Sequence, residues 1–350
     1  MLTSVIVILL LFVCVILIGF LYTKKNERNG PFHPQGPKIK PIESSFQWDK
    51  TPPRKFRPFK PKYSLTMGLS TPDHQDWLLI EDSYLNRVNY HKEIFESSVA
   101  ESTCLCHETA ESAVQELYDY SLDFALARFP RYFKKISKAA VLNTIINRVL
   151  PATSTAAIHE GKTSRDLLRL LGENFEEDFL LLGFDPDVQE YRLRACTGIA
   201  AEGFTWANRM NMKLTDIHRP IPQYKERLQF SMNKAFRNMV PGNLVQRTTY
   251  AVQVSSPNDL YLPDGTEKVD GTTDLDECGF LRLERQQLTR LKKSEFICFS
   301  IRTYMYPLRD IKSEGLGEAM IDAVNGWPDD FAVYKHRADW SDSIFKYLKT

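Results

Sequence analysis

The sequence predicts an α+β protein in which helices come first and a mainly antiparallel sheet with flanking helices follows. In the first half of the chain, apolar residues recur at helical spacing. In the second half, several stretches alternate between polar and apolar residues or are rich in β-branched and aromatic ones. The sequence shows neither an alternating strand–helix–strand pattern nor a glycine-rich phosphate-binding loop, so a nucleotide-binding fold is disfavoured.

The predicted elements follow from these patterns in chain order. Helical spacing is found over residues 77–95 and 114–125, and the second of these helices should end before Phe129-Pro130. Thr163 or Ser164 can cap a helix that begins at Arg165. Apolar residues four apart then predict a helix over 224–236. The predicted strands are 190–196, Val245–Val254, 279–283 and 296–304.

The composition excludes several classes of protein. The 350 residues include 45 Lys and Arg against 44 Asp and Glu, and 43% are hydrophobic, which argues against a disordered, collagen-like or nucleic-acid-binding chain. The charge is uneven, however. Residues 24–62 contain eleven basic and three acidic residues, a net of +8, whereas residues 1–23 contain none. Because the whole chain has a net charge of +1, the remainder must be near −7.

The N-terminus predicts a membrane anchor. Val5 to Tyr22 is an uncharged run of 18 residues, the lower limit for a spanning helix. A cleaved signal peptide is the alternative, but the run lacks a preceding basic region and a small-residue cleavage site. Lys24, Lys25 and Arg28 follow the run, which predicts a single-pass protein, in the endoplasmic reticulum membrane, with its body in the cytosol. The few cysteines, without framework spacing, fit such a reducing compartment.

We therefore expect three parts. Residues 1–23 form the transmembrane anchor, in contact with membrane lipid, and residues 24–62 form a basic, proline-rich tether with a semi-extended backbone. Residues 63–350 form the globular domain. A body of that size is one large domain or two small ones.

Three stretches are candidates for chemistry. His218 follows an acidic helix end and precedes Pro220 and Pro222, which suits an axial metal ligand or a general base. The alternative is a helix-terminal histidine that bonds a local carbonyl. Residues 282–291 are expected to leave a strand and enter a helix, so that Arg and Glu side chains cluster as an anion site or as a structural network. Arg302 lies on an apolar strand, where a cross-strand pair is the alternative to a site.

Taken together, these stretches resemble the alpha-subunit family of haem-dependent oxidative N-demethylase, in particular a fungal, membrane-anchored branch. The resemblance covers roughly residues 57–350. It is carried by the segments 57–61, 63–69, 77–84, 171–179, 217–222, 282–291, 301–304 and 306–308.

The resemblance implies a PAS-like sheet that encloses a b-type haem and oxidative removal of an N-methyl group from a small amine or a secondary-metabolite intermediate. A separate reductase with flavin and an iron–sulfur centre would deliver the electrons. His218 is the expected ligand of the haem iron, because it alone among the seven histidines matches a family motif. Arg282, Arg285 and Arg302 are candidates to bind the haem propionates or an anionic substrate group, and Glu284 is the candidate catalytic acid or base.

The chain also departs from the family pattern. Thr249-Tyr250 stands where the family tends to have Asn-Trp, and Ala200–Phe204 replaces a Phe-Pro-Ser-Gly-Phe turn. Lys292 replaces a proline and Gln223 a glycine. A second interpretation therefore stays open: a non-catalytic PAS-like module that binds haem or another ligand as a sensor or accessory protein.

Overall fold

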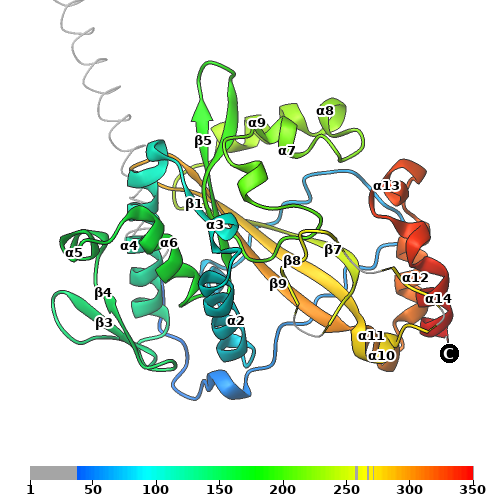
Figure 1. The fold of residues 1–350 in the computed structure, drawn as a ribbon, viewed down its shortest axis with the longest axis horizontal. Helices are drawn as coiled ribbons and strands as arrows, with labels where there is room; N and C mark the ends of the chain where they lie inside the picture. Colours follow the sequence, from blue (N-terminus) through cyan, green and yellow to red (C-terminus); the bar gives the residue numbers. More distant parts are fainter. Residues whose placement is uncertain (1–37, 257–258, 266–267, 271, 350) are drawn as a thin grey trace, which may run out of the picture.

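A six-stranded antiparallel sheet forms the centre of the protein. The computed structural model describes residues 38–256, 259–265, 268–270 and 272–349 (Figure 1). The strand order is β1-β6-β5-β9-β8-β7, and the mainly antiparallel sheet with flanking helices confirms the predicted α+β class. Its strands are β1 (Cys104–Cys106), β5 (Asp178–Asp185), β6 (Glu190–Thr197), β7 (Val245–Val254), β8 (Gly279–Arg290) and β9 (Ile297–Pro307).

A second, three-stranded sheet lies outside this one. It consists of β2 (Phe133–Lys135), β3 (Ala140–Asn143) and β4 (Arg148–Pro151), all antiparallel. The sequence patterns did not predict it, because strands of three or four residues are too short to establish an alternation.

The helices surround the central sheet in three groups. The first group is α2 (Tyr84–Glu96), α3 (Ala100–Thr103), α4 (Glu111–Arg128), α5 (Ser154–His159) and α6 (Ser164–Gly172). The second is α7 (Leu214–Ile217), α8 (Tyr224–Arg227) and α9 (Gln229–Arg237). The third is α10 (Leu275–Cys278), α11 (Leu308–Ser313), α12 (Gly317–Asn325), α13 (Asp329–Tyr334) and α14 (Ser341–Lys349). Five short 3₁₀ turns, η1 (Trp48–Lys50), η2 (His74–Asp76), η3 (Glu108–Ala110), η4 (Ala207–Arg209) and η5 (Arg337–Asp339), complete the described elements.

The structure confirms one predicted helix start, divides a second predicted helix and contradicts a third. The Thr163 side chain caps α6 in a reciprocal capping box with Asp166, as expected from the sequence. The predicted helix over 224–236 is divided at Leu228 into α8 and α9. The segment 282–291, expected to enter a helix, instead continues as β8 to Arg290, so that prediction is wrong.

The register of the three long strands gives the central sheet two distinct faces. Leu283 lies opposite Tyr304, and we call their side the Leu283 face. Leu288 lies opposite Phe299, and we call the other side the Leu288 face. Because side chains alternate along a strand, even-numbered residues of β8 belong to the Leu288 face and odd-numbered ones to the Leu283 face.

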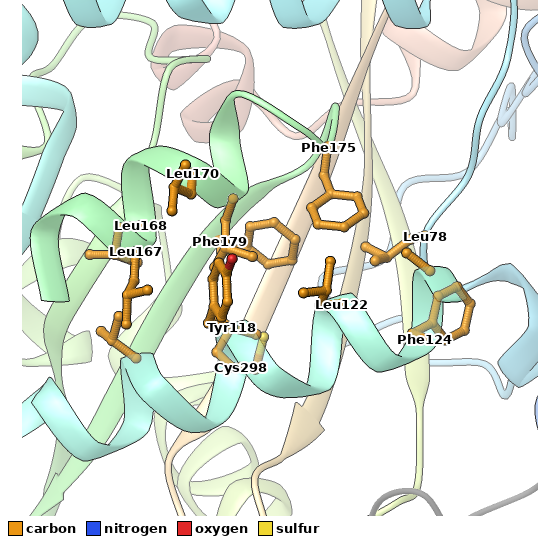
Figure 2. Packing of buried hydrophobic residues seen from close by; sticks show 14 of the residues in the cluster. Leu78, Tyr118, Leu122, Phe124, Leu167, Leu168, Leu170, Phe175, Phe179 and Cys298 are labelled. Atoms are coloured by element: carbon orange, nitrogen blue, oxygen red, sulfur yellow. The ribbon is translucent and has the colours of Figure 1, made fainter. Parts of the chain in front are cut away.

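Two groups of helices cover the Leu283 face. Figure 1 shows α2, α4 and α6 gathered at one end of the sheet and α10, α11, α12 and α14 at the other. Figure 2 shows Tyr118 and Leu122 of α4 packed against Phe179 and Cys298 of the sheet, with leucines of α6 completing the same core. At the other end, the C-terminal helices bury Leu281, Leu283 and Tyr304. Burial of this apolar surface stabilises the sheet from one side along its whole length.

The Leu288 face is covered by the second group. Leu214 of α7, Tyr224 of α8 and Phe236 of α9 are buried against Leu288 and Ile301 of the sheet. Over β7 and the middle of β8, polar residues replace these apolar contacts, and the residues are only half-buried.

Among the described residues, one stretch of β9 pairs with a strand on one side only. Its pairing with β5 ends at Ile301, whereas its pairing with β8 continues to Pro307. Helix α2 lies beside the uncovered stretch, and Arg87 donates to the Thr303 carbonyl at 3.3 Å. The Tyr90 hydroxyl accepts from the backbone N–H groups of Leu260 and Tyr261.

The described part of the predicted tether lies along the body. Ile42, Phe46 and Trp48 pack against the core beneath α4, and Phe56 packs near the C-terminal helices. Arg57 pairs with Glu314 at 2.7 Å. Apart from η1, residues 38–62 form no helix or strand, and these contacts hold the segment on the body.

The predicted membrane location requires correction. Within the described ranges, no helix is long and apolar enough to span a bilayer. The predicted anchor, residues 1–23, lies outside the described residues, and the structure provides no spanning helix to support a single-pass location.

Candidate functional site

His218 lies over the Leu288 face, immediately after α7. Its Nδ1 is 2.8 Å from the Leu214 carbonyl, and its ring stacks on Tyr224 with centroids 4.6 Å apart and planes within 8°. A carbonyl can only accept, so Nδ1 carries the hydrogen and Nε2 keeps its lone pair. Burial lowers the pKa of His218, the bond to Leu214 opposes that shift, and the positive charges of Arg247 and Arg209 lower it further.

This geometry reconciles the two interpretations of His218. The bond to a local carbonyl, which was the structural alternative, is present. A histidine that binds a metal through one ring nitrogen usually donates its other N–H to such an acceptor. The structural bond therefore prepares the neutral ring for a ligand role.

Three charged side chains of the candidate site share the Leu288 face. Arg247 of β7 lies opposite Gln286, and Glu284 lies opposite Thr249, so both belong to this face. Arg282 is on the same side, two residues from Glu284. Its Nη1 donates to Gln253 at 2.8 Å, and its Nε is 3.7 Å from a Glu202 carboxylate oxygen.

Arg247 and Arg282 keep unused donors. The Nε of Arg247 is buried without a hydrogen-bond partner in the described structure, and so are the Nε and Nη2 of Arg282. Buried N–H groups without acceptors cost about 1–3 kcal/mol each, so they mark places where a ligand acceptor would be stabilised.

The loop that carries Glu202 is held by a buried carboxylate. Asp178, at the start of β5, accepts from the backbone N–H groups of Ile199 and Ala200, each at 2.9 Å. Burial raises the pKa of Asp178 to about 6, against the effect of these two bonds. Leu262 then pairs with the loop backbone, donating to the Ala201 carbonyl at 2.8 Å.

Lys335 follows α13 and adds a further cation. Its ammonium lies 5.5 Å from the centre of the Tyr334 ring. Burial lowers the pKa of Lys335, while the charges of Glu202 and Glu284 raise it. The ammonium is therefore within electrostatic reach of both carboxylates.

The structure separates Arg285 and Arg302 from this group. Both belong to the Leu283 face, where they lie opposite each other on β8 and β9. Arg285 donates to Gln246 at 2.9 Å and to the Asp76 carbonyl. The predicted cluster of Arg282, Glu284 and Arg285 on one ligand face is thus divided, because β8 continues where a helix start was expected.

Arg302 is the centre of a buried ionic network. Its guanidinium contacts Glu81 at 2.7 Å, Glu176 at 2.6 Å and Glu177 at 3.3 Å, and all four side chains are at most 3% exposed. This is the cross-strand or structural role that the sequence left open for Arg302, rather than a place beside His218.

Three of the family departures lie at the site, and the first is the Ala200–Phe204 loop, which carries Glu202. Thr249 faces the Leu288 side opposite Glu284, whereas Tyr250 packs on the other face against Phe59 and Trp327. Gln223 has a positive φ of 59°, a conformation that glycine adopts without strain.

Sequence patterns missed the roles of Asp178 and Lys335. Asp178 belongs to a run of acidic residues that offers no spacing signal, and Lys335 is brought to the sheet only by the fold. Arg247 is not among the residues predicted from the sequence, although its place on the predicted strand Val245–Val254 contains the relevant signal.

The donor set fits haem better than a metal held by several side chains. Among the residues that the structure describes, no group of three or more His, Cys, Asp and Glu side chains could hold a metal ion. A single histidine with a free Nε2, next to arginine donors that lack acceptors, is what an iron porphyrin with carboxylate substituents requires.

An antiparallel sheet flanked by helices, with a histidine and two arginines that keep unused donors over one face, defines an α+β protein with a candidate anion-binding site. The chain belongs to the family described as haem-dependent oxidative N-demethylase, alpha subunit-like, which matches residues 68–345. No curated protein matches the chain. Membership identifies an oxidoreductase family with a haem cofactor, in agreement with the resemblance.

Proposed function

We propose that the protein is a haem b-dependent oxidoreductase that removes an N-methyl group from a small amine, with a secondary-metabolite intermediate as one candidate. The observation that carries the proposal is the geometry of His218. Its Nδ1–H is committed to Leu214, its ring is held by Tyr224, and its neutral Nε2 is left for iron.

The strand order supports a PAS-like sheet. Strand β5, the first of the hairpin β5–β6, lies beside β9, the last strand of the chain. Strand β8 lies on the other side of β9, and β7 lies beyond β8. This arrangement places the Leu288 face beneath the segment that carries His218.

The residues of the Leu288 face have separable roles in this proposal. His218 would hold the iron through Nε2. Arg282 and Lys335 would bind the propionates. Arg282 lies four strand residues, about 13 Å along β8, from the residue opposite Arg247, so the two arginines would bind different groups. Bound haem supplies the oxidising chemistry. Glu284, which accepts a 2.8 Å bond from Gln286, would exchange a proton with the substrate amine.

Electrons would come from a separate protein with flavin and an iron–sulfur centre. Within the described residues we find one candidate cofactor site. Haem oxidations of this type consume electrons that the substrate alone does not supply. A reductase partner would supply these electrons.

The test uses the full chain expressed with a haem supply. A Soret band, a haem extract with the spectrum of haem b, and formaldehyde release from an N-methylamine in the presence of oxygen and reductant are expected. Haem binding without turnover of any N-methylamine would favour the non-catalytic module, and a chain that stays colourless would contradict both.

A further inference from the structure

Arg247 and Glu284 carry opposite charges and lie near each other on one face of the sheet. They lie on neighbouring strands and on the same face, with Arg247 opposite Gln286 and Glu284 two residues further along. Such diagonal neighbours have backbones about 7–8 Å apart. Long side chains from these positions can converge on a group between them.

The two side chains do not satisfy each other. No hydrogen bond or ion pair joins Arg247 to Glu284 in the part of the chain that the structure describes, and the Arg247 Nε has no acceptor there. Across the sheet, Thr303 lies opposite Glu284, and its buried hydroxyl also has no partner among these residues. Arg247 and Thr303, each with an unused hydrogen-bonding atom, thus flank Glu284 on the two adjacent strands, and Glu284 accepts from Gln286 at 2.8 Å.

A surface pocket lies between the N-terminal segment, the start of α8 and the start of α13. Its volume is about 230 Å³, and its lining includes Lys62, Tyr63, Arg227 and Phe331. Tyr63 stacks on Phe331 with centroids 4.4 Å apart. Burial raises the pKa of Tyr63, and the charge of Arg247 opposes that shift, so Tyr63 is within electrostatic reach of Arg247.

The charges at the pocket and at Arg247 favour an anionic group. Lys62 and Arg227 are exposed at the pocket, and Arg247 is within electrostatic reach of Tyr63, which lines it. Two cations at the pocket stand against one carboxylate, that of Asp330, which accepts from Gln223 at 2.9 Å. Guanidinium is the side chain that binds carboxylate in a bidentate manner.

We propose that the substrate is an N-methylated amino acid, whose carboxylate binds Arg247 and whose amine faces Glu284. The inference rests on the proposed demethylation and specifies its substrate class. A simple alkylamine would leave the Arg247 donor without an acceptor, whereas a zwitterion satisfies both charges.

The experiment compares N-methylglycine with N-methylglycinamide, which has the same size and amine but no carboxylate. Calorimetry on the haem-loaded full chain should show binding at least tenfold tighter for N-methylglycine, a difference of about 1.4 kcal/mol. Arg247→Gln should abolish this preference and Arg247→Lys should retain part of it. Arg165→Gln, a surface arginine paired with exposed Glu101, should leave the preference unchanged.

Equal affinity of the wild-type chain for the acid and the amide would overturn the inference without any variant. If the haem-loaded chain releases formaldehyde from dimethylamine and shows no preference for the acid, the substrate class is wrong and the proposed function stands. If the chain binds no haem yet prefers the acid, the proposed function is wrong and Arg247 remains the carboxylate site.

Discussion

Arg282 and Arg285 are three residues apart on one strand, and their side chains lie on opposite faces of the sheet. Arg282 meets Gln253 and Glu202 beside the candidate haem site, whereas Arg285 meets Gln246 and the Asp76 carbonyl beneath the N-terminal segment. Both are at most 2% exposed, so neither is a surface charge. Their different surroundings give the substitutions different expected effects.

Arg285→Leu should unfold more easily and bind haem normally. The substitution removes hydrogen bonds from a buried charged donor, worth about 1.5–3 kcal/mol each, and leaves Gln246 without its donor. Urea unfolding should show the loss, while haem titration of the folded fraction stays unchanged. Weak haem binding by a stable variant would restore Arg285 to the site.

Arg282→Gln should weaken haem binding. The substitution removes donors to Gln253 and to the Leu260 carbonyl, so stability also falls, and a propionate would lose the Nε and Nη2 donors, which have no hydrogen-bond acceptor among the described residues. We expect haem affinity to fall at least tenfold, measured by transfer of haem to an acceptor protein. Unchanged transfer kinetics would remove Arg282 from the propionate contacts.

His218→Ala should abolish or strongly shift the Soret band, and His159→Ala, at an exposed position, should leave it unchanged. Burial lowers the pKa of His218, so its ring remains neutral at pH values somewhat below the pKa of a free histidine. Haem retention should therefore be constant from pH 8 to about 6.5, and fall only in more acidic solution. A decline centred at the pKa of free histidine would contradict this environment.

Glu284→Gln should reduce turnover and leave haem binding unchanged. An amide keeps the shape of the side chain but cannot take a proton, and general acid–base catalysis typically contributes about 10²–10⁴-fold. Formaldehyde release should fall by that order, while Glu226→Gln on the exposed surface of α8 serves as the matched control. Full activity in Glu284→Gln would exclude the proton-transfer role.

The network around Arg302 predicts an unusual dependence of stability on pH. Burial raises the pKa of Glu177 to about 7, against the attraction of Arg302, so the folded state takes up a proton that the unfolded chain releases near its ordinary value. This contribution to stability is complete below about pH 4.5 and is lost as the pH rises through 7. Unfolding free energies of the wild type should therefore contain a component that declines between pH 5 and 8.

Glu177→Gln tests that component, because the amide keeps an oxygen for Arg302 without ionising. The decline should become shallower in this variant and persist in Glu318→Gln, at an exposed position of α12. An identical decline in Glu177→Gln would place its origin in another group.

The sequence allowed the fold class and the long elements to be predicted, because periodicity reports directly which side of an element is buried. Helices α2, α4 and α6 and strands β6 to β9 were found in this way. Arg285 faces away from Arg282 because β8 continues as a strand to Arg290. The residues around Arg285 are polar, so no alternation with apolar residues indicates in the sequence where this strand ends. Lys335 reaches the site only through the packing of the C-terminal helices, which no local pattern encodes.

The unpaired stretch of β9 has a consequence for production of the protein. Beyond Ile301 one side of this strand has no neighbouring strand, and Arg87 with the rest of α2 occupies the place. An open strand edge is a template on which other chains can assemble. Variants that loosen α2 should therefore accumulate as insoluble aggregates during synthesis, and their low yield would be mistaken for a loss of enzymatic competence unless the soluble fraction is assayed by itself.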